Sequence, residues 1–358
     1  MGQLIELEGY LRAAGDGDAL RGDAGRAVLA IAEAGRRIAG LLAAGPLAGD
    51  LAALRSAEHF GDTQKELDLR ADALVLDALR LSGVVGVAAS EERDGALILD
   101  PAAPLAVAVD PLDGSGNIDA AASMGTVFAV LPARGADSFA QPGARQVAAG
   151  FLLYGAQTAL VVTLGDGTRA FTLDPASGRF LGRAETLRVP AETGEYAVNG
   201  SNWRHWDAAV RSYVSHCQMG TAGPRGRDFN TRWLGAMVGE AYRILARGGV
   251  YLYPGDVRPG YEQGRLRLVY EANPIAMLVE QAGGLATDGR QRILDLEPRS
   301  LHQRVPLVFG SAREVECVRA CYEKHATEIS PLFGTRTLFR TGTSAFGTAA
   351  PGVAFPCR

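Results

Sequence analysis

Residues 105–119 read Leu-Ala-Val-Ala-Val-Asp-Pro-Leu-Asp-Gly-Ser-Gly-Asn-Ile-Asp, and this stretch decides the fold. The apolar beginning predicts a buried strand that ends at Asp110, because Pro111 cannot donate to a strand ladder. A second acid, Asp113, precedes a Gly-Ser-Gly turn. Unpaired charge beside a core is costly, so we expect a cation between the two carboxylates. Mg²⁺ prefers such oxygen ligands and carries phosphate in its remaining positions, which makes metal-assisted phosphate chemistry the first hypothesis.

This stretch allows three other interpretations. Gly114-x-Gly116-x-x-Asp119 has an acid where a dinucleotide fingerprint needs its third glycine. Phosphatases with an aspartyl nucleophile need two Asp separated by one residue, and here two residues separate them. The remaining alternative is a turn in which Asp110 and Asp113 cap a following helix.

Two further segments bring acids to the ends of predicted strands. The apolar run 84–89 leads into Glu91 and Glu92, and the alternating run 266–270 predicts a strand that leads into Glu271. Asn273 and Pro274 then predict an N-cap and the first residue of a helix. Ligands bind at the carboxyl edge of open α/β sheets, so these acids are expected to converge there. Their mutual repulsion favours two or more divalent cations, which clamp the oxygens of a phosphoryl displacement.

Asp62 and Asp68 flank the start of a helical pattern whose apolar face includes Leu67, Ala71 and Val75. Acids at this position either orient an attacking water or cap the helix. The sequence leaves both roles open.

Composition places limits on function and organisation. The 358 residues, 47% of them hydrophobic, suffice for two modest domains, and the net charge of −4 gives no electrostatic case for nucleic acid or an anionic membrane. No apolar run approaches the roughly 18 residues of a membrane span, and the N-terminus lacks a signal pattern, so a cytoplasmic protein is expected. Residues 1–80 are expected to be mainly helical, and short strands are expected at 127–131, 147–153, 159–164 and 171–173. We predict an N-terminal α+β domain over 1–190, a C-terminal α/β domain over 191–328 and a disordered tail over 329–358.

These motifs resemble those of class 1 fructose-1,6-bisphosphatases, within the Mg²⁺-dependent, lithium-sensitive sugar and inositol phosphatases. The resemblance runs from about residue 58 to about residue 325, and the stretches at 270–274 and 302–306 favour the fructose branch. It implies a layered α/β sandwich of two domains with the metal cleft between them. It also implies hydrolysis of fructose 1,6-bisphosphate to fructose 6-phosphate by Mg²⁺-activated water, in gluconeogenesis or the Calvin cycle. The motif stretches are 61–68, 90–92, 110–119, 125–128, 150–155, 267–274, 280–287, 291–295 and 302–310.

The resemblance also implies residue roles and partners. Two or three Mg²⁺ per subunit are expected, with Mn²⁺ as a possible substitute, in a homotetramer whose Arg232 serves a neighbouring subunit. Arg267 is expected close to the phosphate-binding residues in the same strand. The implied metal ligands are Glu91, Glu92, Asp110, the carbonyl of Leu112, Asp113 and Glu271; the implied catalytic acids are Asp62, Asp68 and Glu92; the implied substrate-binding residues are Asp113, Gly114, Ser115, Gly116, Asn199, Arg232, Tyr253 and Arg265.

Several positions depart from the family pattern. Gly116 stands where the family commonly has Ser, and Arg265 stands where it commonly has Lys. Asn202 and Trp233 occupy positions that are often Tyr. These departures leave sedoheptulose 1,7-bisphosphate open as an alternative or additional substrate. A non-catalytic sugar-phosphate sensor is a further alternative, although all the implied metal acids are present. The family's AMP site and its chloroplast-type cysteine insertion are not matched, so control by AMP or thioredoxin is not expected.

Overall fold

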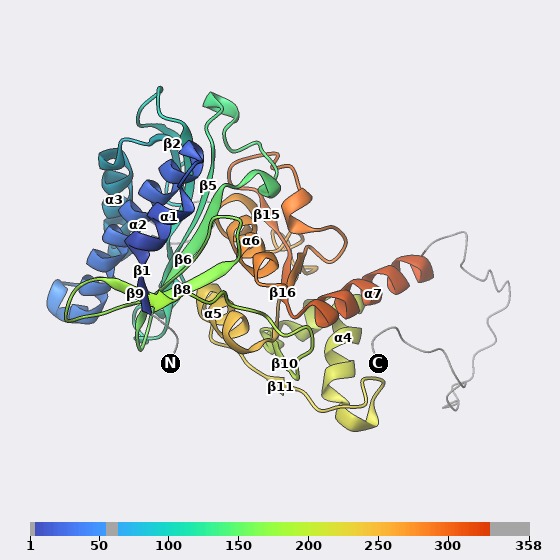
Figure 1. Ribbon diagram of the computed structural model, residues 1–358. Coiled ribbons are helices and arrows are strands. Elements are labelled where there is room, and N and C mark those ends of the chain that lie inside the picture. The colour runs from blue at the N-terminus through green and yellow to red at the C-terminus, as the bar shows by residue number, and fades with distance from the viewer. Residues whose placement is uncertain (1–3, 55–63, 330–358) are drawn as a thin grey trace, which may run out of the picture.

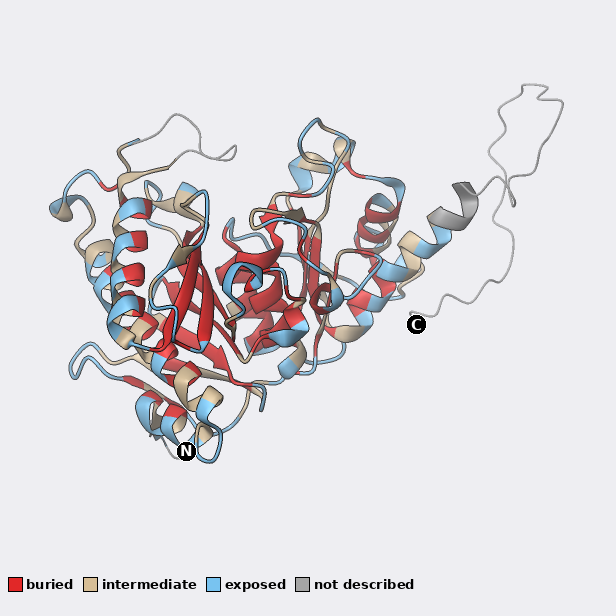
Figure 2. Cartoon of the chain, turned by 90° about the horizontal axis from the view of Figure 1, so that it is seen from above, coloured by how far each residue is buried: buried red, intermediate tan, exposed pale blue. Residues whose placement is uncertain are grey.

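The computed structural model describes residues 4–54 and 64–329, which form five alternating layers of helices and sheets (Figure 1). A helical layer, a nine-stranded sheet, a pair of central helices, a five-stranded sheet and an outer helical pair follow one another. This is the layered α/β sandwich predicted from the sequence. Figure 2 shows that the buried residues concentrate in the two sheets and in the helices between them.

The large sheet has the strand order β1-β9-β8-β7-β6-β5-β4-β2-β3. Its β2–β4 pair is parallel and its other pairs are antiparallel, so it is not the parallel sheet typical of doubly wound folds. The strands are β1 (Leu4–Glu6), β2 (Val85–Ser90), β3 (Leu97–Ile98), β4 (Leu105–Asp113), β5 (Met124–Pro132), β6 (Ala148–Tyr154), β7 (Thr158–Thr163), β8 (Thr168–Leu173) and β9 (Phe180–Arg183).

Three helices cover one face of this sheet: α1 (Leu7–Ala14), α2 (Ala19–Ala44) and α3 (Glu66–Ser82). The side chain of Asp18 caps α2 by accepting the backbone N–H of Arg21, and Gly83 ends α3 in the left-handed conformation. Successive strand residues face opposite sides of the sheet. In β4, Leu105, Val107 and Val109 therefore pack against these helices.

The opposite face of the large sheet packs on the central helices α5 (Met237–Arg247) and α6 (Asn273–Gln281). These helices pack in turn on the five-stranded sheet, whose strand order is β11-β10-β12-β16-β14. The outer helices α4 (Ala208–Gln218) and α7 (Ala312–Ile329) cover its far side. The strands are β10 (Glu195–Ala197), β11 (Asn230–Thr231), β12 (Val250–Tyr253), β14 (Leu285–Thr287) and β16 (Leu307–Gly310), and a separate pair is formed by β13 (Leu266–Arg267) and β15 (Arg304–Val305).

Two predicted strand ends are wrong. β4 does not stop at Asp110 but continues to Asp113, because Pro111 lies where the β4–β5 register is irregular and no regular ladder bond is required. The strand predicted over 266–270 is limited to β13, and residues Leu268–Ala272 form a π-helical turn, η7, that leads directly into α6. Asn273 is therefore the first residue of α6 and not its N-cap.

The other predicted elements agree with the structure. The helical region before residue 80, the apolar run at 84–89 and the four short strands between 127 and 173 are all present, whereas β1 was not predicted. Within residues 4–54 and 64–329, none of the helices combines the length and the apolar character needed to cross a membrane.

Candidate active site

A cavity of about 430 Å³ lies where the acid-bearing ends of β2 and β4 meet η7 and the loops beside β12 and β13. Acidic side chains line one part of the cavity, the acid end, and Trp233, Tyr251, Tyr253 and Arg265 line another part, the distal end. The lining residues are Gln64, Asp68, Glu91, Glu92, Asp110, Leu112, Asp113, Gly114, Ser115, Gly116, Trp233, Gly235, Met237, Tyr251, Tyr253, Arg265, Leu266, Arg267 and Glu271.

Three acids form the centre of the acidic end. One carboxylate oxygen each from Glu91, Asp110 and Glu271 lies within 4.8 Å of the others. Asp110 belongs to β4, Glu91 directly follows β2, and Glu271 comes from η7. The sequence correctly predicts that these acids converge, but Glu271 arrives on a π-helical turn and not at a strand end. Such turns occur frequently at functional sites, because they redirect a side chain without ending the helix.

Hydrogen bonds to backbone groups fix these carboxylates. The backbone N–H of Leu112 donates to Oδ1 of Asp110 over 3.0 Å, and that of Arg267 donates to Oε2 of Glu271 over 2.5 Å. Oδ2 of Asp113 accepts the backbone N–H of Val238 over 2.9 Å, at the start of α5. The acid end therefore joins the large sheet to a central helix.

The electrostatics of this cluster are those of a cation site. Burial, together with repulsion from Glu91, raises the pKa of Asp110 and of Glu271 well above the ordinary carboxyl range. Burial also raises the pKa of Asp113 to about 6. Buried, mutually repelling carboxylates are stabilised by a bound divalent cation, and an all-oxygen ligand set suits a hard ion. The residues present therefore fit a metal-binding group.

Two more acids, Glu92 and Asp68, lie beside this cluster. Burial and the negative charge of Asp68 raise the pKa of Glu92 to about 8, and Gln64 Nε2 donates to Oε2 of Glu92 over 2.6 Å. Burial raises the pKa of Asp68 to about 6, although the backbone N–H of Lys65 donates to its Oδ2 over 2.7 Å. Asp68 thus caps the start of α3 and also lines the cavity. Its position is compatible with both roles left open by the sequence, which were capping the helix and orienting an attacking water. Asp62 lies outside the described residues.

The predicted phosphate-binding turn lies at the rim of the acid cluster. Gly114 has a φ of +80°, and a Cβ there would lie 2.9 Å from Cβ of Ala236, so the position requires glycine. Lys65 Nζ donates to the carbonyl of Ser115 over 3.0 Å and so ties the turn to the start of α3. Gly116 has no atom within 4 Å of the position of a Cβ and does not require glycine.

Aromatic and cationic residues form the distal end of the cavity. Trp233 stacks on Tyr251 with a centroid separation of 5.9 Å and an interplanar angle of 1°, and it is inclined to Tyr253 at 6.4 Å. Trp233 and Tyr253 also line a small adjoining pocket that contains Asn199 and Asn202. Arg265 and Tyr253 therefore share the main cavity, while Asn199 belongs to its side pocket.

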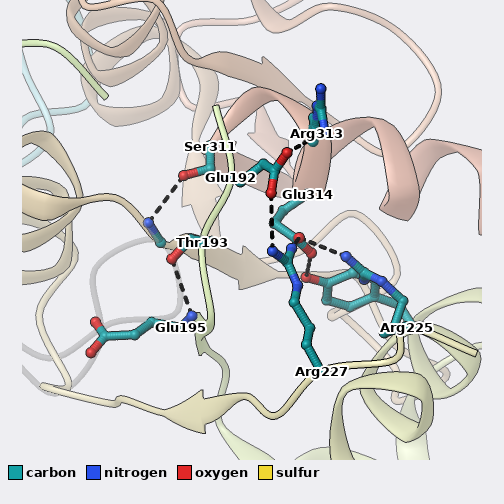
Figure 3. A network of polar contacts seen from close by, with 10 residues as sticks. Glu192, Thr193, Glu195, Arg225, Arg227, Ser311, Arg313 and Glu314 are labelled. Atoms are coloured by element: carbon teal, nitrogen blue, oxygen red, sulfur yellow. Dashed lines mark hydrogen bonds and ion pairs between the residues drawn. The ribbon is translucent and has the colours of Figure 1, made fainter. Parts of the chain in front are cut away.

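Arg232 does not line either of these two pockets. Its Nε pairs with Oε1 of Glu195 over 3.1 Å, and Glu195 also accepts Nη1 of Arg243 over 2.6 Å. Nearby, a buried ion network holds the loop that precedes β11: Glu314 of α7 binds Arg225 and Arg227 (Figure 3). The segment around Arg232 is thus tied to the rest of the chain through ion pairs of Glu195 and Glu314.

Sequence reasoning missed several lining residues, among them Gln64 and Tyr251. A lone Gln before a helix carries no distinctive pattern. Only one of Tyr251 and Tyr253 was expected to face the pocket, and Tyr253 was chosen, whereas both line the cavity. Arg267 lines the same cavity as Tyr253 and Arg265, as expected, but the sequence did not predict that its Nε pairs with Oε1 of Glu91 over 3.1 Å. The alternating pattern of Leu266, Arg267 and Leu268 does not indicate that Arg267 pairs with an acid 176 positions away.

Comparison with known proteins agrees with this geometry. The N-terminal domain model of fructose-1-6-bisphosphatase matches residues 21–185, and the C-terminal domain model matches residues 189–323. A class 1 fructose-1,6-bisphosphatase of Acidiphilium cryptum is 59% identical over 322 residues, which cover 88% of this chain and 90% of the relative. One from Nitrobacter hamburgensis is 47% identical over 345 residues, covering 95% of this chain and 100% of the relative.

A solved structure gives the same result. The fructose-1,6-bisphosphatase of Leishmania major in holo form superposes with a TM-score of 0.83 at 32% identity, covering 90% of this chain and 99% of that one. The chain belongs to the class 1 fructose-1,6-bisphosphatase family.

Proposed function

We propose that this protein hydrolyses D-fructose 1,6-bisphosphate to D-fructose 6-phosphate and phosphate. The observation that carries the proposal is a single cavity lined both by a buried carboxylate cluster and by Arg265. We infer that such a cavity holds both phosphates of one substrate. One lies over the metal-binding acids, and the other faces a guanidinium that binds phosphate through its planar fork. The names of the relatives support the same substrate.

The metal ligands in this proposal are Glu91, Glu92, Asp110, Asp113, Glu271 and the carbonyl of Leu112, and the metal is Mg²⁺, two or three per subunit, with Mn²⁺ as a substitute. When bound, the ions neutralise the buried carboxylates and draw negative charge from the phosphate that reacts. Gly114 and Ser115 orient that phosphate from the turn after β4. Glu92, whose carboxylate Gln64 holds, accepts a proton from the attacking water, and Asp68 orients that water together with Asp62.

In this proposal Arg265, Tyr253 and Asn199 bind the distal phosphate. Gly116 lies beside the reacting phosphate, next to Gly114 and Ser115. Arg232, which is held by Glu195, serves the site of a neighbouring subunit in a homotetramer. Coexpression of Arg232→Ala with Asp110→Asn tests this arrangement. Recovery of activity in the mixed oligomer, above that of either variant alone, is expected only if one site takes residues from two subunits.

The direct test is phosphate release from fructose 1,6-bisphosphate with Mg²⁺ and with EDTA. We expect release that EDTA abolishes. The same assay on sedoheptulose 1,7-bisphosphate tests the alternative substrate that Asn202, Trp233 and Arg265 suggest. Release from the sedoheptulose sugar alone would contradict the proposal, and release from neither sugar would favour a sensor. The pathway, the cytoplasmic location and the domain boundaries at 190 and 328 stay predictions.

A further inference from the structure

Tyr261 lies beside two arginines, Arg258 and Arg265, and lines the side pocket next to the main cavity. Nη1 of Arg265 donates to the Tyr261 hydroxyl over 2.8 Å, and the Arg265 guanidinium carbon lies 5.1 Å from the centre of the ring. The guanidinium carbon of Arg258 lies 4.3 Å from the same ring centre. One aromatic residue therefore contacts Arg265 through its hydroxyl and through its π-system.

The loop that carries Tyr261 is closed by its own hydrogen bonds. The backbone N–H of Tyr261 donates to the carbonyl of Arg258 over 3.0 Å, and the Tyr261 carbonyl accepts the N–H of Asp256 over 3.0 Å and that of Gly264 over 2.9 Å. Asp256 also binds the guanidinium of Arg258 through both carboxylate oxygens, with Nε 3.0 and 3.1 Å away. The loop thus holds the Tyr261 ring in a defined place.

The loop is also fastened to the neighbouring pocket wall. The backbone N–H of Val257 donates to the carbonyl of His205 over 3.1 Å, at the end of the turn that Asn199 opens. Tyr261 lines the same side pocket as Asn199. A displacement of Tyr261 would therefore change the geometry on which Arg265 depends.

We infer that Tyr261 is a positioning residue that sets the location and plane of the Arg265 guanidinium, and with them the affinity for the distal phosphate of the substrate. The inference rests on the proposed function. Arg265 binds a phosphate well only when its planar fork is correctly oriented, and a flexible side chain loses entropy when it adopts that orientation. Tyr261 maintains the orientation before the ligand arrives. Arg258, neutralised by Asp256, supports the ring and does not bind the ligand itself.

Tyr261→Phe tests this inference because it removes the hydroxyl and keeps the ring. Titration calorimetry measures the Kd of fructose 6-phosphate and of a non-hydrolysable phosphonate analogue of fructose 1-phosphate, both with Mg²⁺. We expect Tyr261→Phe to raise the first Kd about three- to tenfold, the loss typical of one ordinary hydrogen bond because the hydroxyl acts only through Arg265, and to leave the second within about twofold. KM for the bisphosphate should rise by a similar factor while kcat stays within about twofold.

The matched control is Tyr242→Phe, which removes the hydroxyl that accepts a hydrogen bond from Gln157 over 3.0 Å, outside the cavity. It should change neither Kd. A further test repeats Tyr261→Phe in the Arg265→Lys background. There the effect should fall below about twofold, because lysine has no planar fork to orient.

An equal loss of affinity for both ligands, no loss for either, or an undiminished effect in the Arg265→Lys background would overturn the inference. The two Kd measurements do not depend on turnover. A wild-type protein that binds both ligands but releases no phosphate would therefore contradict the proposed function alone.

Discussion

The two ends of the active-site cavity are built in different ways. The acid end takes its side chains from β4, from η7 and from the residue directly after β2, and backbone N–H groups bind its carboxylates inside the core. The distal end combines Tyr251 and Tyr253 of β12 with segments around residues 199–205, 231–235 and 254–265, where side chains bind other side chains. The core therefore dictates the first end, whereas the second depends more on contacts between side chains.

This difference explains where the chain departs from the family pattern. Asn202, Trp233 and Arg265 all lie in the distal end or its side pocket, while the metal-binding acids are complete. A change in a loop alters how a substrate is held and leaves the packing of the core intact. A change in the acid end affects a network that joins the large sheet to α5. Substrate preference is thus expected to vary more easily than the reaction.

The largest effect is expected from a neutral substitution at the acid end. Asp110→Asn keeps an oxygen for the N–H of Leu112 but removes one charge from the metal-binding cluster. We expect kcat with Mg²⁺ to fall on the order of a hundred- to a thousandfold. In EDTA the melting temperature should stay the same or rise, because a repulsive buried charge has been removed.

The control for this prediction is Asp77→Asn, which neutralises an exposed acid that pairs with Arg80 on α3. Its activity should match that of the wild type. If Asp110→Asn retained most of its activity, or melted well below the wild type in EDTA, the acid end would be a structural network and not a metal site.

A smaller effect is expected in the pH dependence of stability without metal. Burial raises the pKa of Asp113 to about 6 and that of Glu92 to about 8, whereas unfolded carboxyls titrate near pH 4. The folded protein therefore binds more protons than the unfolded chain between about pH 4 and pH 8, and its stability should fall as the pH rises. We expect the melting temperature in EDTA to drop by several degrees from pH 6 to pH 8.

Saturating Mg²⁺ should remove most of this slope, because the ion stabilises the ionised carboxylates. Asp110→Asn should reduce the slope, and the distal variant Arg265→Lys should leave it unchanged. If the melting temperature in EDTA fell equally with pH in the wild type, Asp110→Asn and Arg265→Lys, the titrating groups would lie outside the acid end. The two ends would then not differ in their electrostatics.

The same distinction decides how much could be predicted from the sequence. Asp110 and Glu91 were predictable because acids rarely end apolar strands without a partner, and that pattern can be seen in one chain. Glu271 was predicted in the right place but on the wrong element, because alternation over five residues does not separate a strand from a π-helical turn that follows a short one.

The distal end offered no comparable signal. Arg265, Tyr253 and Asn199 entered only through the family resemblance, and Tyr261 not at all, since a tyrosine in a Gly-rich loop has no periodic partner. The order β1-β9-β8 and the antiparallel majority of the large sheet also escaped prediction. They depend on pairing between segments distant in sequence, such as Leu4 with Arg183.

The smallest expected effect tests whether the boundary between the two ends falls inside the turn at residues 114–116, which we propose binds phosphate. Gly114→Ala must place a Cβ 2.9 Å from Ala236 at a φ of +80°, so it should cost about 1–2 kcal/mol of stability and lower activity. Gly116→Ser meets no atom within 4 Å and should leave stability unchanged and KM within about twofold. Thermal melts and KM measurements on both variants test the contrast. If both substitutions lowered stability and raised KM equally, the whole turn would be as rigid as the acid end. The boundary between the two ends would then lie after residue 116.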